Sequence, residues 1–252
     1  MAKDNVHANH NRPERDRAAD KDSGHSVPGD AERKHNTYDL RDQLGRRPVS
    51  SHDLVFRGVI WDIVRDRVDF APGVRFTREY MRHTGAVSVL ALDVREGIDH
   101  VLLIRQYRHP AGMTFWELPA GLLDIGGEAP HLAARRELRE ETGHDADTLH
   151  VLLDVFPTPG GSDEAIRIFL ATGVIEASED GFERRDEESE IEVRWFPLQD
   201  VVSAALRGDL ANGTMSSAVL ALAAVRARGM SFDDLRPADA PWDQAPRIRG
   251  LA

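Results

Sequence analysis

The first 50 residues contain almost no aliphatic or aromatic side chains, and this limits where the chain can build a core. A segment that buries so little apolar surface cannot offset the entropy that it loses on ordering. We therefore expect residues 1–50 to form a disordered polar tail. Its four histidines are irregularly spaced, so we interpret them as solvated side chains and not as metal ligands: His7, His10, His25 and His35.

The composition indicates one main globular core and argues against nucleic acid as a partner. Of 252 residues, 41% are hydrophobic and 30% are charged, which is typical of a globular domain with a polar appendage. The 32 Lys and Arg against 43 Asp and Glu give a formal net charge of -11. Such a balance repels a phosphate backbone unless basic residues cluster locally, and the sequence shows no such cluster.

The chain contains no cysteine, which excludes disulfides and thiolate metal sites. Residues 1–24 mix acidic, basic and histidine side chains and lack the apolar run that a secretory signal or a membrane span needs. Their acidic residues also argue against a transit peptide. The sequence therefore predicts a cytoplasmic protein without a membrane partner.

Short runs rich in β-branched and aromatic residues begin at Leu54. The first runs predict a small antiparallel sheet at residues 54–64, 68–71 and 74–84, with breaks at Arg65-Asp66 and Pro72-Gly73. Later runs predict strands at residues 86–92, 101–107, 149–155, 166–171 and 192–196.

One helix has strong boundary signals. It starts at Pro130 and ends at Thr142, before Gly143, and both the proline and the glycine are preferred at these positions. Two more helices are predicted at about residues 198–206 and 216–228. Residues 231–252 are rich in Pro and Asp, and we expect a loose C-terminal tail.

Three glutamates share one face of the helix that starts at Pro130. Glu137, Glu140 and Glu141 stand at i, i+3 and i+4, and their mutual repulsion would be relieved by a hard cation such as Mg²⁺. Ala133 and Ala134 are expected on the same face, where their small size would leave room for a metal-bound diphosphate. The spacing alone, however, is more often that of a solvated, salt-bridged helix face.

The whole segment from Gly121 to His144 resembles the Nudix box. The matching residues are Gly121, Glu128, Arg136, Glu137, Leu138, Glu140, Glu141 and Gly143. Two departures concern loop geometry and packing more than the metal-binding glutamates. The loop between Gly121 and Glu128 is one residue longer than the family pattern, and His144 occupies an aliphatic position.

The resemblance extends from Leu54 to Arg228 and is greatest to the actinobacterial ADP-ribose pyrophosphatases. It implies an α/β fold, with a Nudix α/β/α sandwich of mixed sheet at residues 85–230. It also implies that the small antiparallel sheet, at residues 51–84, joins two subunits of a homodimer. Pro159 stands fifteen residues after His144, as in ADP-ribose hydrolases, although a plain turn at Pro159-Gly160-Gly161 is the alternative.

The same resemblance implies a role for each site residue. With Mg²⁺ or Mn²⁺ as the cofactor, the expected metal ligands are Ala120, through its carbonyl, Glu137, Glu141 and a shared Glu140. The expected substrate-binding residues are Arg105, Arg108, Glu117 and Pro159, although each arginine is alternatively an ordinary surface residue. Arg136 and Glu140 are expected to assist catalysis, and the supporting residues are Gly121, Glu128 and Gly143.

The general base is expected in an acidic loop before the last predicted strand. Glu187, Glu188 and Glu190 precede Trp195-Phe196, and alignment on the Trp-Phe-Pro ending favours Glu188. A solvated acidic loop is the alternative.

The implied reaction is attack by a metal-activated water on a diphosphate linkage, giving AMP and ribose 5-phosphate from ADP-ribose. Alternatives within the superfamily are other nucleoside-diphosphate sugars, dinucleoside polyphosphates and damaged nucleotides. An alternative of another class is a non-catalytic ADP-ribose sensor. Such sensors commonly lose box glutamates, all of which this chain retains.

Overall fold

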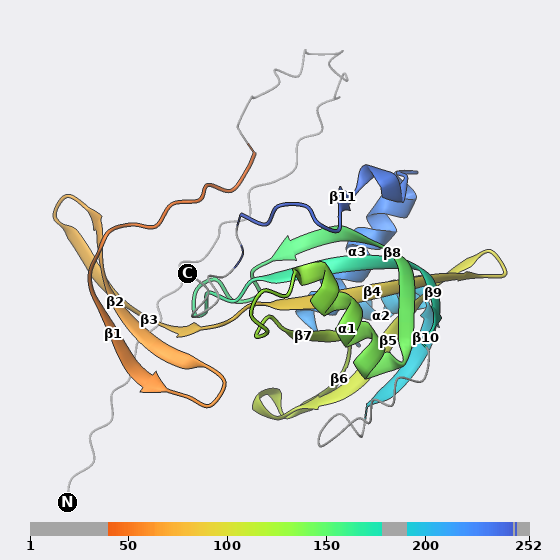
Figure 1. Ribbon diagram of the computed structural model, residues 1–252, viewed down its shortest axis with the longest axis horizontal. Helices are drawn as coiled ribbons and strands as arrows, with labels where there is room; N and C mark the ends of the chain where they lie inside the picture. Colours follow the sequence, from red (N-terminus) through yellow and green to blue (C-terminus); the bar gives the residue numbers. More distant parts are fainter. Residues whose placement is uncertain (1–39, 178–190, 244, 246–252) are drawn as a thin grey trace, which may run out of the picture. The chain divides into compact units, whose positions relative to one another are not determined.

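The computed structural model describes residues 40–177, 191–243 and 245 (Figure 1). Most of the expected tail at residues 1–50 therefore lies outside the described residues. The described strands and helices are β1 (Val49–Arg57), β2 (Asp62–Ala71), β3 (Val74–Arg82), β4 (Ala86–Arg95), β5 (Ile98–Arg108), η1 (His109–Ala111), β6 (Met113–Glu117), β7 (Ala120–Leu122), α1 (Pro130–Thr142), β8 (His144–Val155), β9 (Ile166–Glu176), β10 (Glu192–Pro197), α2 (Leu198–Arg207), α3 (Gly213–Ala227), η3 (Phe232–Asp234) and β11 (Arg236–Pro237).

The first three strands form the expected small antiparallel sheet, in the order β1-β2-β3. The predicted break at Arg65-Asp66 is wrong, because both residues lie inside β2 and find charged or polar partners on neighbouring strands. Arg65 donates to Glu79 at 2.7 Å, and the Tyr80 hydroxyl donates to Asp66 at 3.2 Å. The chain turns instead after Gly58, where an added Cβ would overlap the Trp61 carbonyl, so only glycine fits.

The second sheet is mixed and has the strand order β10-β5-β4-β9-β8-β11, with β6 paired to β5 and β7 to β4. Strands β4 and β9 run parallel, and the other neighbouring strands run antiparallel. Because side chains alternate along a strand, β4 contributes to two cores. Val87 and Val89 pack in the core beneath α1, whereas Leu90 and Leu92 pack in the core that contains residues of α2 and α3.

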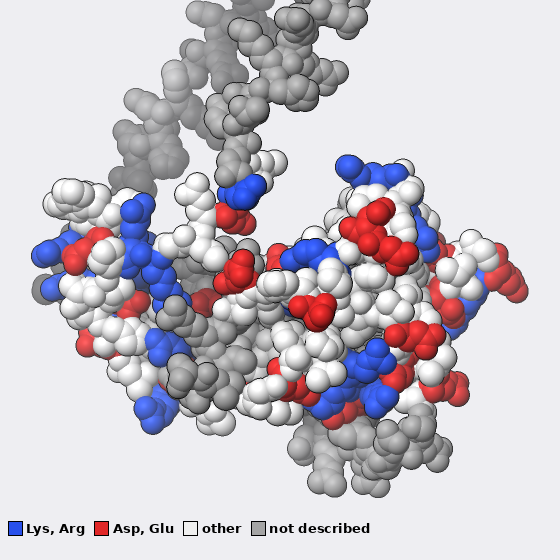
Figure 2. All heavy atoms as spheres, turned by 45° about the horizontal axis from the view of Figure 1, so that its top comes forward, with Lys and Arg blue, Asp and Glu red and all other residues white. Residues whose placement is uncertain are grey.

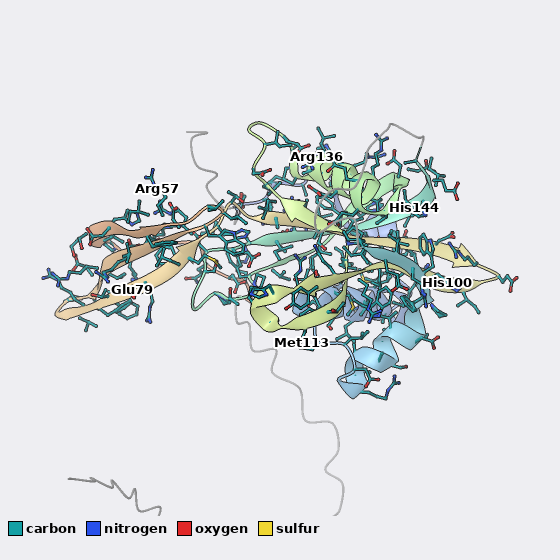
Figure 3. The ribbon with its side chains drawn as sticks, turned by 90° about the horizontal axis from the view of Figure 1, so that it is seen from below. Arg57, Glu79, His100, Met113, Arg136 and His144 are labelled. Carbon is teal, nitrogen blue, oxygen red and sulfur yellow. The ribbon has the colours of Figure 1, made fainter. Side chains whose placement is uncertain are left out.

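Figures 1 and 3 show α1 on one face of this sheet and α2 on the other. The predicted α/β/α sandwich is therefore confirmed. Helix α1 has the predicted ends, with Gly143 in the left-handed region at φ 72° and its N–H bonded to the Arg139 carbonyl. Helix α3 begins earlier than the predicted residue 216, because the Asn212 side chain caps it by accepting the Met215 N–H at 2.9 Å.

The expected loose tail at residues 231–252 is wrong for residues 231–243, which pack against the second sheet, whereas residues 244 and 246–252 lie outside the described residues. Strand β11 pairs with β8. The almost fully buried Arg167 donates to the carbonyls of Ala240 and Pro241 at 2.6 and 3.1 Å. Its guanidinium also lies 4.8 Å from the centre of the Trp242 ring. We call residues 236–242 the C-terminal strap.

Asp154 of β8 is the anionic partner in this network. It receives two hydrogen bonds from Arg167, at 2.7 and 3.0 Å, and one from Arg236 at 2.5 Å. Burial alone would raise the pKa of the Asp154 carboxyl, but the bonds from both arginines hold that pKa below its ordinary value. The strap is therefore fastened by a buried ion pair.

None of the described helices is long and apolar enough to cross a membrane. On the face shown in Figure 2, basic and acidic side chains are interspersed and not gathered into one basic surface.

Candidate active site

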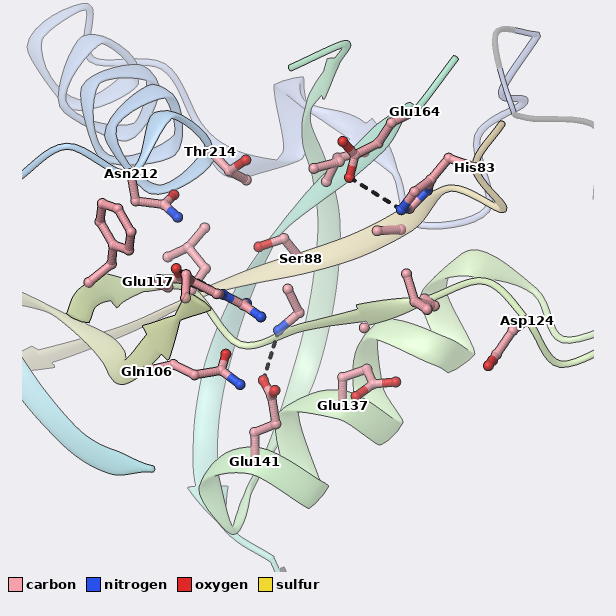
Figure 4. A pocket seen from close by; sticks show the side chains of 18 of the residues that line it. His83, Ser88, Gln106, Glu117, Asp124, Glu137, Glu141, Glu164, Asn212 and Thr214 are labelled. Carbon is pink, nitrogen blue, oxygen red and sulfur yellow. Dashed lines mark hydrogen bonds and ion pairs between the residues drawn. The ribbon is translucent and has the colours of Figure 1, made fainter. Parts of the chain in front are cut away.

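A pocket of about 720 Å³ lies between α1, the β5–β6 hairpin, the start of β9 and the start of α3 (Figure 4). Its lining comes from segments far apart in the sequence, from Ile60 to Thr214. Most of the expected site residues meet here. They are Arg108, Glu117, Ala120, Gly121, Arg136, Glu137, Glu140 and Glu141.

Helix α1 presents its three glutamates to the pocket, as its spacing predicts. Glu141 is buried and accepts the Ala120 N–H at 2.8 Å, which ties the helix to β7. The expectation for Ala133 and Ala134 is wrong, because both are fully buried in the core between α1 and the sheet. They leave no space for a ligand and instead allow the helix to pack closely.

Arg136 organises the glutamates. Its Nη1 donates to Glu137 at 2.6 Å and to Glu140 at 3.0 Å, while its Nε and Nη2 donate to Glu128 at 3.1 and 3.0 Å. The hydrogen bonds to Glu128, together with the charge of Glu137, raise the pKa of Arg136 despite its partial burial. Arg136 therefore stays charged and holds the loop that ends at Glu128 against α1.

The other end of that loop is held by close packing. A Cβ added to Gly121 would overlap the carboxylate of Glu137, so any larger residue would displace this glutamate. The requirement for glycine here is therefore steric. The expected supporting residues Gly121 and Glu128 thus both contact residues of α1.

The donor set suits a hard divalent cation, because it offers carboxylate oxygens and the backbone of Ala120. Among the described residues, no three acidic or histidine side chains already form a group that could hold a metal ion. Arg136 occupies oxygens of Glu137 and Glu140. Each of these bonds uses one oxygen of a carboxylate that has two, so Glu137 and Glu140 can accept Arg136 and a metal ion together.

The charges of the pocket also indicate a cation. Its lining includes six carboxylates and two arginines, and both arginines are paired with carboxylates. The carboxylates are Glu117, Asp124, Glu137, Glu140, Glu141 and Glu164. An anionic diphosphate entering this pocket would be repelled unless divalent cations compensated the excess negative charge.

The β5–β6 hairpin brings together two expected substrate-binding residues. Arg108 donates to both oxygens of the buried Glu117, with its Nη2 at 2.7 Å and its Nε at 3.0 and 3.1 Å. This two-pronged pair fixes the guanidinium plane at the edge of the pocket. Arg108 is therefore oriented before any ligand arrives.

Other expected site residues do not line the pocket. Arg105 lies on the opposite face of β5, where it pairs with Glu192 at 3.4 Å, so its placement favours the surface-arginine alternative. Pro159 belongs to a turn in which the Thr158 carbonyl accepts two backbone N–H groups. Gly143 ends α1. Three further candidates lie outside the described residues, namely Glu187, Glu188 and Glu190.

The structure adds a side of the pocket that the sequence did not indicate, formed by Trp61, His83 and Glu164, which we call the aromatic wall. Because the Gly85 N–H donates to His83 Nδ1 at 2.9 Å, the imidazole proton belongs on Nε2, which faces Glu164 at 3.7 Å. Trp61 stacks on His83 with ring centres 5.7 Å apart. His83 and Glu164 are far apart in the sequence and belong to no short motif, so only the fold brings them together.

The comparisons with known proteins agree with this geometry. Residues 82–217 match the NUDIX domain family. The ADP-ribose pyrophosphatase of Mycobacterium tuberculosis is 41% identical over 196 residues, which cover 78% of this chain and 91% of that protein. The ADP-ribose pyrophosphatase of Bacillus subtilis is 35% identical over 150 residues, which cover 59% and 77%.

A solved structure described as an ADP compounds hydrolase has the same fold. It superposes with a TM-score of 0.60 at 24% identity and covers 76% of this chain and 100% of its own. Together with the glutamate helix, the glycine packed against Glu137 and the matched family domain, these likenesses show that the chain belongs to the Nudix family.

Proposed function

We propose that this Nudix enzyme hydrolyses the diphosphate bond of ADP-ribose to AMP and ribose 5-phosphate, with Mg²⁺ as its cofactor. The observation that carries the proposal is the negative charge of the pocket. Its lining has six carboxylates, including the glutamates of α1, and only two arginines, both of which are paired. Such a pocket suits a diphosphate that binds together with divalent cations. The relatives named ADP-ribose pyrophosphatases support the choice of substrate.

Each wall of the pocket has a part in this reaction. Glu137, Glu140 and Glu141 would hold the cation, which supplies charge neutralisation and a more acidic water when bound. Arg136 keeps the glutamates of α1 in place. Arg108 would bind the diphosphate, and Glu117 holds its guanidinium in plane.

The aromatic wall suits the adenosine half of this substrate. Trp61 offers a flat surface for a base. Glu164 accepts hydrogen bonds and lies beside the Nε2 of His83. The diphosphate would then lie next to Glu137 and Glu141, in the middle of the pocket as Figure 4 shows it.

The general base is part of this proposal and rests on the sequence. We expect Glu188→Gln to lower kcat by roughly 100-fold or more while changing KM little, because a general base acts in the transition state more than in binding. Glu187→Gln and Glu190→Gln serve as matched controls with mild effects. Steady-state kinetics of the three variants decide the matter, and a near-wild-type kcat for Glu188→Gln would assign the base elsewhere.

Product analysis tests the substrate directly. Purified protein with Mg²⁺ is incubated with ADP-ribose, other nucleoside-diphosphate sugars, dinucleoside polyphosphates and nucleoside triphosphates. The proposal expects the highest kcat/KM with ADP-ribose, and AMP with ribose 5-phosphate as products. Preference for another substrate would replace ADP-ribose, and binding of ADP-ribose without turnover would favour the sensor alternative.

We also propose a cytoplasmic homodimer joined through the β1–β3 sheet. The sheet and its β1–β2 turn expose large apolar side chains that a single chain leaves in contact with water: Leu54 is 44% exposed, Phe56 62%, Ile60 61% and Phe70 46%. Clustered exposed apolar residues are typical of a surface that binds a partner. The molar mass from light scattering tests the dimer, and a monomer at micromolar concentration would contradict it.

A further inference from the structure

Gln106 is a polar residue on the buried side of β5 with no assigned role. Side chains alternate along the strand, so Ile104, Gln106 and Arg108 share one face, whereas Arg105 and Tyr107 are exposed on the other. Gln106 is only 8% exposed and lines the pocket. An amide therefore lies at the point where β5 reaches the pocket, at a position where an apolar side chain would continue the core.

The carbonyl oxygen of the Gln106 amide is not satisfied by the described part of the chain. Its Oε1 is buried and accepts no hydrogen bond from any described residue. Its polar neighbours in the pocket do have partners, since Arg108 pairs with Glu117 and Glu141 accepts the Ala120 N–H. A buried carbonyl oxygen without a donor destabilises a fold, so its presence indicates a donor that arrives with the ligand.

The position of Gln106 identifies which half of the ligand it meets. In Figure 4, Gln106 and Glu117 lie toward one end of the pocket and His83 lies toward the other; Glu141 is drawn beside Gln106, and Glu137 lies between Glu141 and the end with His83. A diphosphate held next to these glutamates divides the pocket in two. With adenosine against Trp61 and His83, the group beyond the diphosphate is left beside Gln106.

The chemistry of an amide favours a hydroxyl as its partner. An amide has a donor end and an acceptor end, and rotation by half a turn exchanges them. A sugar hydroxyl both donates and accepts, so it can bond to either end, whereas an ionised phosphate oxygen only accepts. A neutral amide also adds no charge to a pocket that already holds six carboxylates.

We propose that Gln106 binds a hydroxyl group of the sugar beyond the diphosphate and thereby favours sugar nucleotides over nucleotides that end in a phosphate. The inference rests on the proposed function. It makes Gln106 a specificity-determining residue, because a site that loses a hydrogen bond to a substrate hydroxyl loses affinity for that substrate selectively.

The test compares two ligands that differ only beyond the diphosphate. For wild type and Gln106→Met, KM and kcat are measured with ADP-ribose, and Ki is measured for ADP as a competitive inhibitor. ADP carries the adenosine and the diphosphate but no second sugar. We expect Gln106→Met to raise KM for ADP-ribose by about 10-fold, which corresponds to the loss of one neutral hydrogen bond. Ki for ADP should stay within about 2-fold of the wild-type value.

Two controls separate binding from folding. Because Gln106→Met removes an unpaired buried polar group, its Tm should equal or exceed that of wild type, whereas a fall in Tm would indicate a structural role and contradict the proposal. Tyr107→Phe changes the exposed neighbour on the same strand and should leave both constants unchanged. Gln106→Leu makes the same replacement with a different apolar shape and should give the same Tm and the same two constants as Gln106→Met.

The outcomes distinguish this inference from the function on which it rests. If wild type does not hydrolyse ADP-ribose, the proposed function and this inference both fail. If wild type hydrolyses it and the variants match wild type, only the role of Gln106 is overturned. Equal weakening of ADP-ribose and ADP would place Gln106 at the diphosphate and would also overturn the assignment to a sugar hydroxyl.

Discussion

Glu141→Gln and Glu137→Gln should each reduce kcat for ADP-ribose by roughly 100-fold or more, because each removes an anionic ligand from the proposed cation site. The fold should survive both changes. A glutamine at position 141 still offers an oxygen to the Ala120 N–H. At position 137, loss of the charge leaves Arg136 paired with Glu128 and Glu140.

The measurement is kcat against Mg²⁺ concentration, together with Tm. We expect both variants to need more Mg²⁺ than wild type, while Tm changes by a few degrees at most. Glu96→Gln makes the same chemical change in the turn between β4 and β5 and should behave as wild type. Near-normal turnover in both Glu137→Gln and Glu141→Gln would show that α1 does not hold the catalytic cation.

The second large effect concerns stability. Arg167→Met should lower the free energy of unfolding by about 3 kcal/mol or more, since removing one partner of a buried ion pair leaves the other charge poorly compensated. Asp154 would retain only Arg236, and the carbonyls of Ala240 and Pro241 would lose their donor. Denaturant unfolding measures the loss. Arg207→Met removes an exposed pair with Asp209 and should cost less than about 1 kcal/mol.

The same pair predicts a dependence on pH. The folded-state pKa of Asp154 lies below its ordinary value of 3.8, so its stabilisation is complete above that value and is lost as the pH falls through the folded pKa. Wild type should therefore lose stability below about pH 4, and Asp154→Asn should flatten this part of the curve. An unchanged acid limb would show that other carboxylates control acid unfolding.

Local signals in the sequence were sufficient where one segment carries all the information. The ends of α1 follow from Pro130 and Gly143, and the buried strands follow from apolar runs. Charged residues misled the prediction in β2, because the partners of Arg65 and Asp66 lie on other strands. The strap was missed for the same reason, since Arg167 makes a Pro- and Asp-rich segment part of the fold.

The same distinction holds for the site residues: those within one motif could be predicted from the sequence, and those from distant segments could not. The glutamates of α1 and their arginine lie within one short motif, and the sequence predicted their common face. Gln106, His83 and Glu164 share no short motif, and only the fold brings them to the same pocket. Arg105 and Arg108 are near neighbours in the sequence, yet strand alternation directs only Arg108 into the pocket.

The loop between Gly121 and Glu128 is anchored at both ends, by the contact with Glu137 and by the bonds from Arg136. Its outer part contains Ile125, which is 48% exposed, and Gly127, which adopts φ 80°. Lengthening an anchored loop adds little closure entropy. The loop can therefore hold an extra residue while both ends stay anchored, and we expect its exposed outer part, beyond the pocket residue Asp124, to accept a short inserted peptide tag.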